Sequence, residues 1–379
     1  MPAEQGPQEW DDILVPPPLH NPVISDGIIR DSAADFEVEE IPAFEPAGTG
    51  DHLFLWVQKQ GYSTSELTRH IARICGINAR DIGTAGQKDK HAVTRQWISV
   101  PASAASDWND LPSEEITVLR TIRHTKKLRT GQLRGNRFQV AVRSPESEFT
   151  AADVRILEPQ LASLQTTGFA NYFGPQRFGH GGATLAQGLR LLSASTGNRG
   201  QRRRIQPWLR RLALSAAQSA VFNRVTARRV AEGSIADPQV GDVVIRKGGT
   251  RPYQFDPLAG TPDDAPTSES SNRDPVIPAG PLPGPNMVPA AGRIAAAEDE
   301  VMSTLGLSHA SFEQQAKLCS GTRRPMLAFP QDCSCELTDD GRIRLGFTLS
   351  RGCYATVLLR ELFTTVTDSR SDDTAQLSD

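Results

Sequence analysis

Hydrophobic residues follow two kinds of spacing, and the two are mixed along the whole chain. Short runs of β-branched, aromatic and aliphatic residues between turn residues are typical of strands, and apolar positions three or four apart are typical of helices. These patterns predict strands at 28–30, 35–39, 52–57, 96–100, 138–142 and 342–349. They predict helices at 63–76, 150–165, 212–232 and 354–363. Because strands and helices do not alternate regularly, we expect an α+β fold rather than a doubly wound sheet.

Three segments carry neither pattern. Residues 1–22 are polar and rich in proline, so we expect them to be loose. Residues 256–286 hold eight prolines and three glycines, which predicts a long surface loop or a partly disordered excursion. The glycine-rich run at 179–182 has no strand before it, so we interpret it as a flexible turn and not as a dinucleotide site.

Length and composition narrow the class of protein. The chain has 379 residues, which suits two domains or one domain with a large insertion. With 38% hydrophobic and 22% charged residues it is globular in composition. No run of eighteen apolar residues predicts a membrane span, and the first residues lack the pattern of a secretory signal. We therefore expect a cytoplasmic protein with no membrane contact.

The chain offers little for metal or nucleotide binding. Its five cysteines are an odd number and lie scattered, which is untypical of a disulfide scaffold. Cys333 and Cys335 are the one close pair, and no histidine lies at ligand spacing from them. A phosphate-binding GxxxxGK[ST] loop is absent from the sequence. We expect no metal and no cofactor.

Positive charge is concentrated although the net charge is only −3. Residues 120–137 contain seven Lys or Arg and no acid, and residues 199–229 contain nine Arg and no acid. One such block is usually a solvated helix face. Two of them favour a phosphate backbone as the partner, so we expect nucleic acid binding.

A loop at 85–96 carries the strongest candidate chemistry. Asp89 lies there between Lys88 and Lys90, with His91 close behind. A carboxyl group with an ordinary pKa of about 3.9 is ionised at neutral pH and is able to attack a sugar or ring carbon directly. A Lys-Asp-Lys turn is more often a solvated surface turn, so the residues alone leave both interpretations open. His91 is the one candidate general base, and a structural or RNA-contacting role suits it better.

Six segments, this loop among them, match the motifs of one known family in the same order, and this favours a catalytic role for the loop. Residues 85–96 resemble the AGxKDxxAxTxQ signature of the tRNA pseudouridine synthase D (TruD) family. The segments at 35–39, 135–138, 171–179, 214–223 and 352–362 are similar to that family's DFxVxE, GNxF, NYFGxQRFG, helical and C-terminal elements. The likeness covers about Ile28 to Thr367, and six ordered motifs are far more specific than any one of them.

The resemblance implies an isomerase that turns a uridine of tRNA, typically position 13 in the D-arm, into pseudouridine without a cofactor. It implies Asp89 as the catalytic residue, and leaves open whether Asp89 attacks C1′, attacks the ring or acts as a base. By match to the motifs, Phe36, Asn136, Phe138 and Tyr354 are expected to bind the uridine. Arg30 or Lys88 is expected to be the cation that pairs with Asp89.

The resemblance also implies a domain plan. We expect a catalytic pseudouridine synthase domain of 23–165 and 319–367, built on a mixed, largely antiparallel sheet. A second α/β domain of 166–318 would be inserted into it, and 368–379 would form an acidic tail. The basic block 120–137 would line the catalytic side, and 199–229 would supply phosphate contacts from the insertion. We expect a monomer that binds tRNA.

Two other classes compete with this interpretation. One is a non-catalytic tRNA-binding protein or chaperone on the same fold, although a carboxylate among lysines would only repel phosphate there. The other is a uracil glycosylase or ribonuclease. A ribonuclease normally needs paired histidines or clustered carboxylates, and the seven histidines here are dispersed.

Overall fold

The computed structural model describes residues 10–104, 115–193, 205–257 and 275–370. The chain forms two compact units, each assembled from two separate segments. The large-sheet unit contains residues 21–168 and 329–379, and the small-sheet unit contains residues 1–20 and 169–328.

The large-sheet unit is built on one sheet, which has ten strands over the described residues. Seven of them follow the order β14-β15-β7-β2-β5-β3-β6, with β1, β4 and β16 beside this path. The strands are β1 (Ile24–Ile29), β2 (Phe36–Pro42), β3 (His52–Lys59), β4 (Gly83–Thr84), β5 (Val93–Pro101), β6 (Ile116–His124), β7 (Leu133–Arg143), β14 (Gln331–Leu337), β15 (Ile343–Ser350) and β16 (Phe363–Asp368). The helices are α2 (Thr64–Ile74), α3 (Ala151–Thr167) and α9 (Ala355–Leu359).

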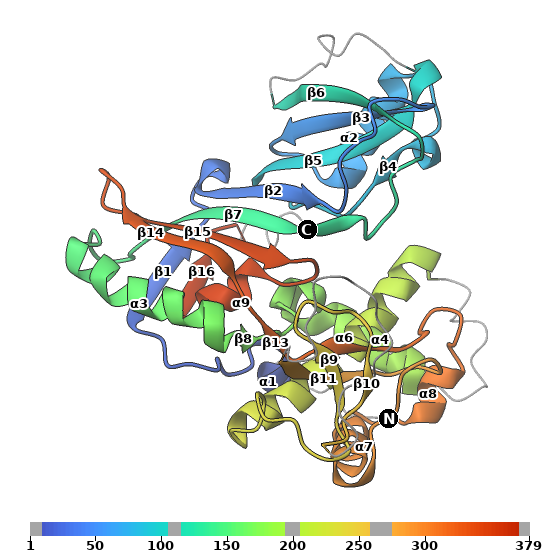
Figure 1. Ribbon diagram of the computed structural model, residues 1–379, viewed down its shortest axis with the longest axis vertical. Helices are drawn as coiled ribbons and strands as arrows, with labels where there is room; N and C mark the ends of the chain where they lie inside the picture. Colours follow the sequence, from blue (N-terminus) through green and yellow to red (C-terminus); the bar gives the residue numbers. More distant parts are fainter. Residues whose placement is uncertain (1–9, 105–114, 194–204, 258–274, 371–379) are drawn as a thin grey trace. The chain divides into compact units, whose positions relative to one another are not determined.

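The sheet is mixed and largely antiparallel, as the family resemblance implied. β2 pairs with β5 and β1 pairs with β16 in parallel, whereas the other described pairs run antiparallel. The β1–β16 ladder runs from Ile24 opposite Phe363 to Ile29 opposite Asp368. The first and last strands of the unit therefore lie side by side (Figure 1).

Helix α2 shows how local sequence and packing agree. Ser63 caps it by accepting a hydrogen bond from the Glu66 backbone, and the Glu66 carboxylate accepts one from the Ser63 backbone. Its apolar side, with Leu67 and Ile71, packs into a core that includes Leu55 and Val57 of β3. Each of these side chains is fully buried, and burial of this kind contributes about 1.5–3 kcal/mol per side chain.

The small-sheet unit combines helices with an antiparallel sheet of order β10-β9-β11-β12. Its strands are β8 (Phe169–Ala170), β9 (Val243–Arg246), β10 (Tyr253–Gln254), β11 (Val276–Leu282), β12 (Thr322–Pro325) and β13 (Leu327–Ala328). Its helices are α1 (Asp11–Leu14), α4 (Ala183–Ser193), α6 (Pro207–Ala231), α7 (Gly292–Thr304) and α8 (His309–Glu313). β8 pairs with β13, which joins the two ends of the inserted segment. Gly188 lets α4 approach α6 closely, because an added Cβ would lie 2.0 Å from the Ala213 carbonyl oxygen.

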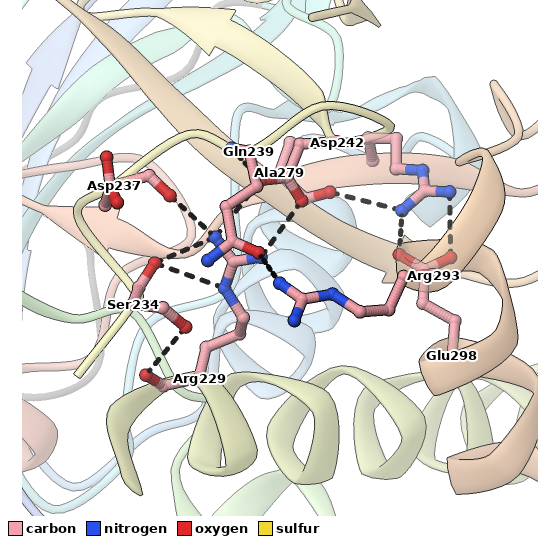
Figure 2. Close-up of polar contacts among 9 residues, drawn as sticks. Arg229, Ser234, Asp237, Gln239, Asp242, Ala279, Arg293 and Glu298 are labelled. Atoms are coloured by element: carbon pink, nitrogen blue, oxygen red, sulfur yellow. Dashed lines mark hydrogen bonds and ion pairs between the residues drawn. The ribbon is translucent and has the colours of Figure 1, made fainter. Parts of the chain in front are cut away.

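Two buried arginine–carboxylate pairs hold this unit together (Figure 2). Arg229 of α6 binds Asp242 at 3.1 Å, and also donates to the carbonyl oxygens of Ser234 and Asp237. Arg323 of β12 binds Glu298 of α7 at 3.0 Å. All four side chains are at most 7% exposed. This is a structural network in which the buried donors and acceptors satisfy one another.

The network corrects one expectation about the basic block 199–229. Arg229 is buried and is committed to Asp242, so it does not supply a phosphate contact. Arg224 binds Asp12 at 2.7 Å, and Arg228 binds Glu300 at 2.6 Å. Residues 199–204 of the block lie outside the described residues. The block is acid-free in sequence, but its C-terminal arginines are neutralised by acids from other segments.

Several element and boundary predictions were also wrong. Residues 10–20 are not loose, because Trp10 and Ile13 are buried in the small-sheet unit. The expected loop 256–286 contains strand β11 at 276–282, while its part at 258–274 lies outside the described residues. The expected helix 354–363 ends at Leu359, and Phe363 begins β16.

The expected boundaries of the insertion, 166 and 318, also differ from those of the small-sheet unit, 169 and 328. β12 and β13 are the reason, since they pair with β11 and β8 of that unit. Asp368, expected in a tail, ends β16 instead, and residues 371–379 lie outside the described part.

Within the described residues, no helix is long and apolar enough to cross a membrane. None of the five cysteines, all of which lie in the described part of the chain, forms a disulfide. Cys333 and Cys335 lie on β14, where burial raises the pKa of both thiols to about 11.

Candidate active site

Asp89 lies in the loop between β4 and β5 of the large-sheet unit. Its Oδ2 is 2.8 Å from Nη2 of Arg30, and its Oδ1 accepts a hydrogen bond of 3.0 Å from the His91 backbone. The side chain is nevertheless 33% exposed. The carboxylate is therefore fixed at both oxygens and still reachable from outside.

Arg30 is the buried partner of this carboxylate. It directly follows β1 and has a φ of 62°, a left-handed conformation that costs a non-glycine residue on the order of 1–3 kcal/mol. Its guanidinium lies 4.0 Å from the centre of the Phe36 ring and also binds Asp368 of β16. The side chain thus lies on an aromatic face and joins two carboxylates, and these contacts offset the backbone strain.

A row of aromatic rings continues from Phe36. The ring of Phe138 meets that of Phe36 edge to face, with 6.1 Å between the ring centres. It stacks on the ring of Phe347, with 5.4 Å between the centres. The register places Phe138 opposite Val38 of β2 and Phe347 of β15, so Phe36, Phe138 and Phe347 share one face of the sheet. Phe36 and Phe138 are 3% and 7% exposed. Both rings are therefore core residues, and Phe36 is connected to Asp89 through Arg30.

Lys88, the other candidate cation for Asp89, is engaged elsewhere. Its Nζ lies 2.8 Å from Oε2 of Glu40 on β2, and this pair is almost completely buried. Glu40 also accepts a hydrogen bond of 3.3 Å from the Trp97 backbone. Of the two predicted cations, Arg30 pairs with Asp89, while Lys88 anchors the loop to the sheet.

Asn136 lies two residues before Phe138 on β7, opposite Glu40 of β2 and Leu349 of β15. Alternation along the strand puts Asn136 and Phe138 on the same face. Among the described residues, its buried Oδ1 has no hydrogen-bond partner. A buried acceptor without a partner needs an explanation, and a bound donor is one.

Two further predicted residues are less tightly tied to Asp89. Tyr354 is partly exposed and precedes α9 in the same unit. The His91 side chain is exposed, and its contact with Asp89 is made by its backbone N–H. Within the described part of the chain, no three His, Cys, Asp or Glu side chains gather in a way that would hold a metal ion.

Lys59 belongs to the site and was not predicted. This last residue of β3 is fully buried, and its Nζ donates to the backbone carbonyl oxygen of Asp89. The burial of Lys59 could have been predicted from the alternation of side chains along β3. Leu55, Val57 and Lys59 lie on one face of this strand, and the first two are core residues. A lysine that ends a buried face in this way indicates an internal acceptor.

The NYFGxQRFG motif lies in the small-sheet unit, where its contacts are structural. The Asn171 side chain donates to the Pro325 carbonyl oxygen at 2.9 Å. Arg324 donates to the Asn171 carbonyl oxygen at 3.1 Å and lies 4.2 Å from the centre of the Phe173 ring. The motif thus ties the start of the inserted segment to its end.

Comparisons with known proteins agree on one family. Residues 23–197 and 189–362 match the family model for tRNA pseudouridine synthase D (TruD). Proteins named tRNA pseudouridine synthase D from Anaeromyxobacter dehalogenans and Methylococcus capsulatus are each 38% identical to this chain. The alignments cover 89% and 91% of this chain, and 93% of each relative.

The fold has a solved counterpart. A crystal structure from Methanosarcina mazei, of a protein ascribed to tRNA pseudouridine synthase D, superposes with a TM-score of 0.70. The two sequences are 23% identical, and the superposition covers 94% of this chain and 98% of the other. The chain therefore belongs to the tRNA pseudouridine synthase D family.

Proposed function

We propose that this protein converts a uridine of tRNA into pseudouridine and that Asp89 is the catalytic residue. In this reaction the N1–C1′ bond breaks, the uracil turns, the C5–C1′ bond forms, the C5 proton is lost and N1 takes up a proton. Substrate and product are isomers, so the balance needs neither an oxidant nor a reductant. The names of the relatives support the substrate class, since they are tRNA pseudouridine synthases.

One observation carries the proposal: a carboxylate that is both held and accessible. Arg30 at 2.8 Å and the His91 backbone at 3.0 Å orient Asp89, while one third of its side chain stays exposed. A positioned carboxylate of this kind is suited to attack a carbon or to remove a proton.

The base would be recognised by Asn136 and supported by the aromatic residues. Uracil offers an N3–H donor, and the buried Oδ1 of Asn136 is an acceptor without a partner among the described residues. Flipping a base out of its stack costs a few kcal/mol, and stacking on an aromatic ring returns about 1–3 kcal/mol. We assign that stacking to Tyr354, a partly exposed residue of the same unit, because Phe36 and Phe138 are buried core residues.

The finer expectations belong to the same proposal. The target is uridine 13 in the D-arm, the large-sheet unit is catalytic, the small-sheet unit is an accessory domain, and the protein acts in the cytoplasm as a monomer. The first basic block supports RNA binding, since Arg120, Arg123, Lys126, Arg129, Arg134 and Arg137 are exposed on or between β6 and β7.

The test is release of tritium from tRNA labelled at uracil C5, in the presence of EDTA and without added nucleotide. The proposal predicts release by the wild type and a pseudouridine that maps to position 13. Release with a product at another position would keep the activity and overturn the target. Tight tRNA binding without any release would favour the non-catalytic tRNA-binding protein.

A further inference from the structure

A buried lysine reaches the backbone of Asp89 from the neighbouring strand. Lys59 ends β3, is fully buried, and donates from Nζ to the Asp89 carbonyl oxygen. The side chain of the same Asp89 is held separately, by Arg30. The residue proposed to be catalytic is thus fixed at its side chain by one buried cation and at its backbone by another.

Lys59 opens a short segment that holds the whole tip of the loop. The Gly61 backbone donates to the Lys90 carbonyl oxygen at 3.1 Å, and the Thr64 hydroxyl accepts from the Lys88 backbone at 2.8 Å. Together with the Lys59 contact, residues 59–64 therefore bind the backbone of residues 88, 89 and 90 in turn. Of these three contacts, the one on Asp89 is the only charged one.

We infer that Lys59 is a positioning residue for the reaction, which holds the Asp89 backbone so that its carboxylate meets the uridine. The inference rests on the function proposed above. A fully buried ammonium is expensive, and an apolar side chain would fill the same place in the core at less cost. Accurate positioning of Asp89 explains why a charged residue is kept at position 59 in spite of this cost. A shift of about 1 Å in a catalytic group can lower the rate on the order of 10²-fold.

The surroundings of Lys59 give the inference a pH signature. The pKa of Lys59 is lowered to about 8, chiefly because the side chain is buried; the Asp89 carboxylate opposes this shift, Lys88 adds to it and Glu66 opposes it. Below this value the hydrogen bond to Asp89 is charge-assisted, and above it the neutral amine donates more weakly. The turnover rate should therefore fall as pH rises through about 8.

The experiment compares Lys59→Met, Lys59→Arg, Lys90→Met and Asp89→Asn by tritium release, tRNA affinity and thermal unfolding. Lys90 is the matched control, since it adjoins Asp89 in sequence but forms an exposed ion pair with Glu66 at 3.3 Å. We expect Lys59→Met to lower kcat about 30- to 100-fold, with KM and tRNA affinity within twofold of wild type and an unchanged or higher Tm. Lys90→Met should leave kcat within twofold. Lys59→Arg should keep most of the activity and lose the fall above pH 8, because an arginine stays charged.

The outcomes separate this inference from the proposed function. If wild type releases no tritium, both fall. If wild type is active, Asp89→Asn is inactive and Lys59→Met retains its kcat, only the role of Lys59 is overturned. A lower Tm with unchanged kcat of the folded protein would likewise show a purely structural lysine. Should Lys59→Met not fold, Lys59→Arg decides, and an alkaline fall identical to that of wild type would overturn the inference.

Discussion

The pairs Arg30–Asp89 and Arg229–Asp242 use the same two residue types for different ends. Each arginine is buried and each contacts its carboxylate, at 2.8 Å and 3.1 Å. Asp242 is 4% exposed and lies in a network whose members satisfy one another (Figure 2), whereas Asp89 is 33% exposed. An ion pair alone therefore does not mark a reactive group, and access to one of its partners is the feature that separates the two.

The surroundings of the two pairs sharpen the difference. Arg229 donates to the carbonyl oxygens of Ser234 and Asp237 beside Asp242, so its side chain closes a local turn. Arg30 has left-handed backbone and lies on the Phe36 ring between carboxylates from a loop and from the last strand. Strain and convergence of distant segments are typical of functional sites, and local closure is typical of structural ones.

The largest expected effect is loss of activity in Asp89→Asn. The amide keeps the size of the side chain but removes its nucleophilicity and basicity, so kcat should fall on the order of 10⁴-fold or more. Since the carboxylate is partly exposed and the buried Arg30 keeps Asp368 as a counter-charge, tRNA affinity and Tm should stay close to wild type. Single-turnover tritium release and thermal unfolding check both statements. Residual activity within tenfold of wild type would refute the catalytic role.

Asp242→Asn should show the opposite profile. Removing one charge of a buried pair leaves Arg229 without its counter-charge, which typically costs about 3–5 kcal/mol of unfolding free energy. We expect denaturant unfolding to report a loss of that size, while the folded fraction keeps its turnover rate. A stable Asp242→Asn protein with low activity would break the distinction between the two pairs.

Arg30→Met should give an intermediate result. It deprives Asp89 and Asp368 of a shared cation and removes the contact with Phe36. The misplaced carboxylate should lower kcat about 10²-fold, with a moderate loss of Tm. Arg30→Lys, which keeps the charge, is the control and should recover part of the rate. Equal losses in both variants would indicate that the guanidinium shape, and not its charge, positions Asp89.

The smallest effect concerns the two basic blocks. Arg134 is exposed on β7, whereas Arg224 of the second block is bound to Asp12 at 2.7 Å. Arg134→Gln should weaken tRNA binding and reduce the slope of log affinity against log salt by about 1. Arg224→Gln should leave that slope unchanged. Salt titrations of tRNA binding compare the two, and equal slopes for both variants would contradict the assignment of the first block to RNA.

Local patterns predicted much of the large-sheet unit. The capping box at Ser63 and Glu66 predicted α2, and short runs of aliphatic and aromatic residues predicted β3 and β7. Strand β11 was missed because Pro278 and Pro281 lack a backbone donor, which argues against a central strand. The structure accommodates Pro278 because its carbonyl oxygen still accepts a hydrogen bond of 2.8 Å from the Met326 backbone. Because Met326 is far from Pro278 along the chain, the sequence around Pro278 could not predict this contact.

In the candidate site, too, some features could be predicted from the sequence and others depended on tertiary structure. Asp89 stood out through its motif, but the choice between Arg30 and Lys88 depended on tertiary structure. Lys88 is adjacent in sequence, yet its side chain reaches Glu40, while Arg30 approaches Asp89 from the end of another strand. Proximity along a loop says little about which side chains meet, because consecutive residues commonly point in different directions.

The most direct test of the comparison measures Asp89→Asn and Asp242→Asn side by side, for C5 tritium release under single turnover and for unfolding free energy. The account predicts a crossed result: no release with wild-type stability for Asp89→Asn, and a wild-type rate per folded molecule with a loss of about 3–5 kcal/mol for Asp242→Asn. Wild-type release by a folded Asp89→Asn protein would contradict it.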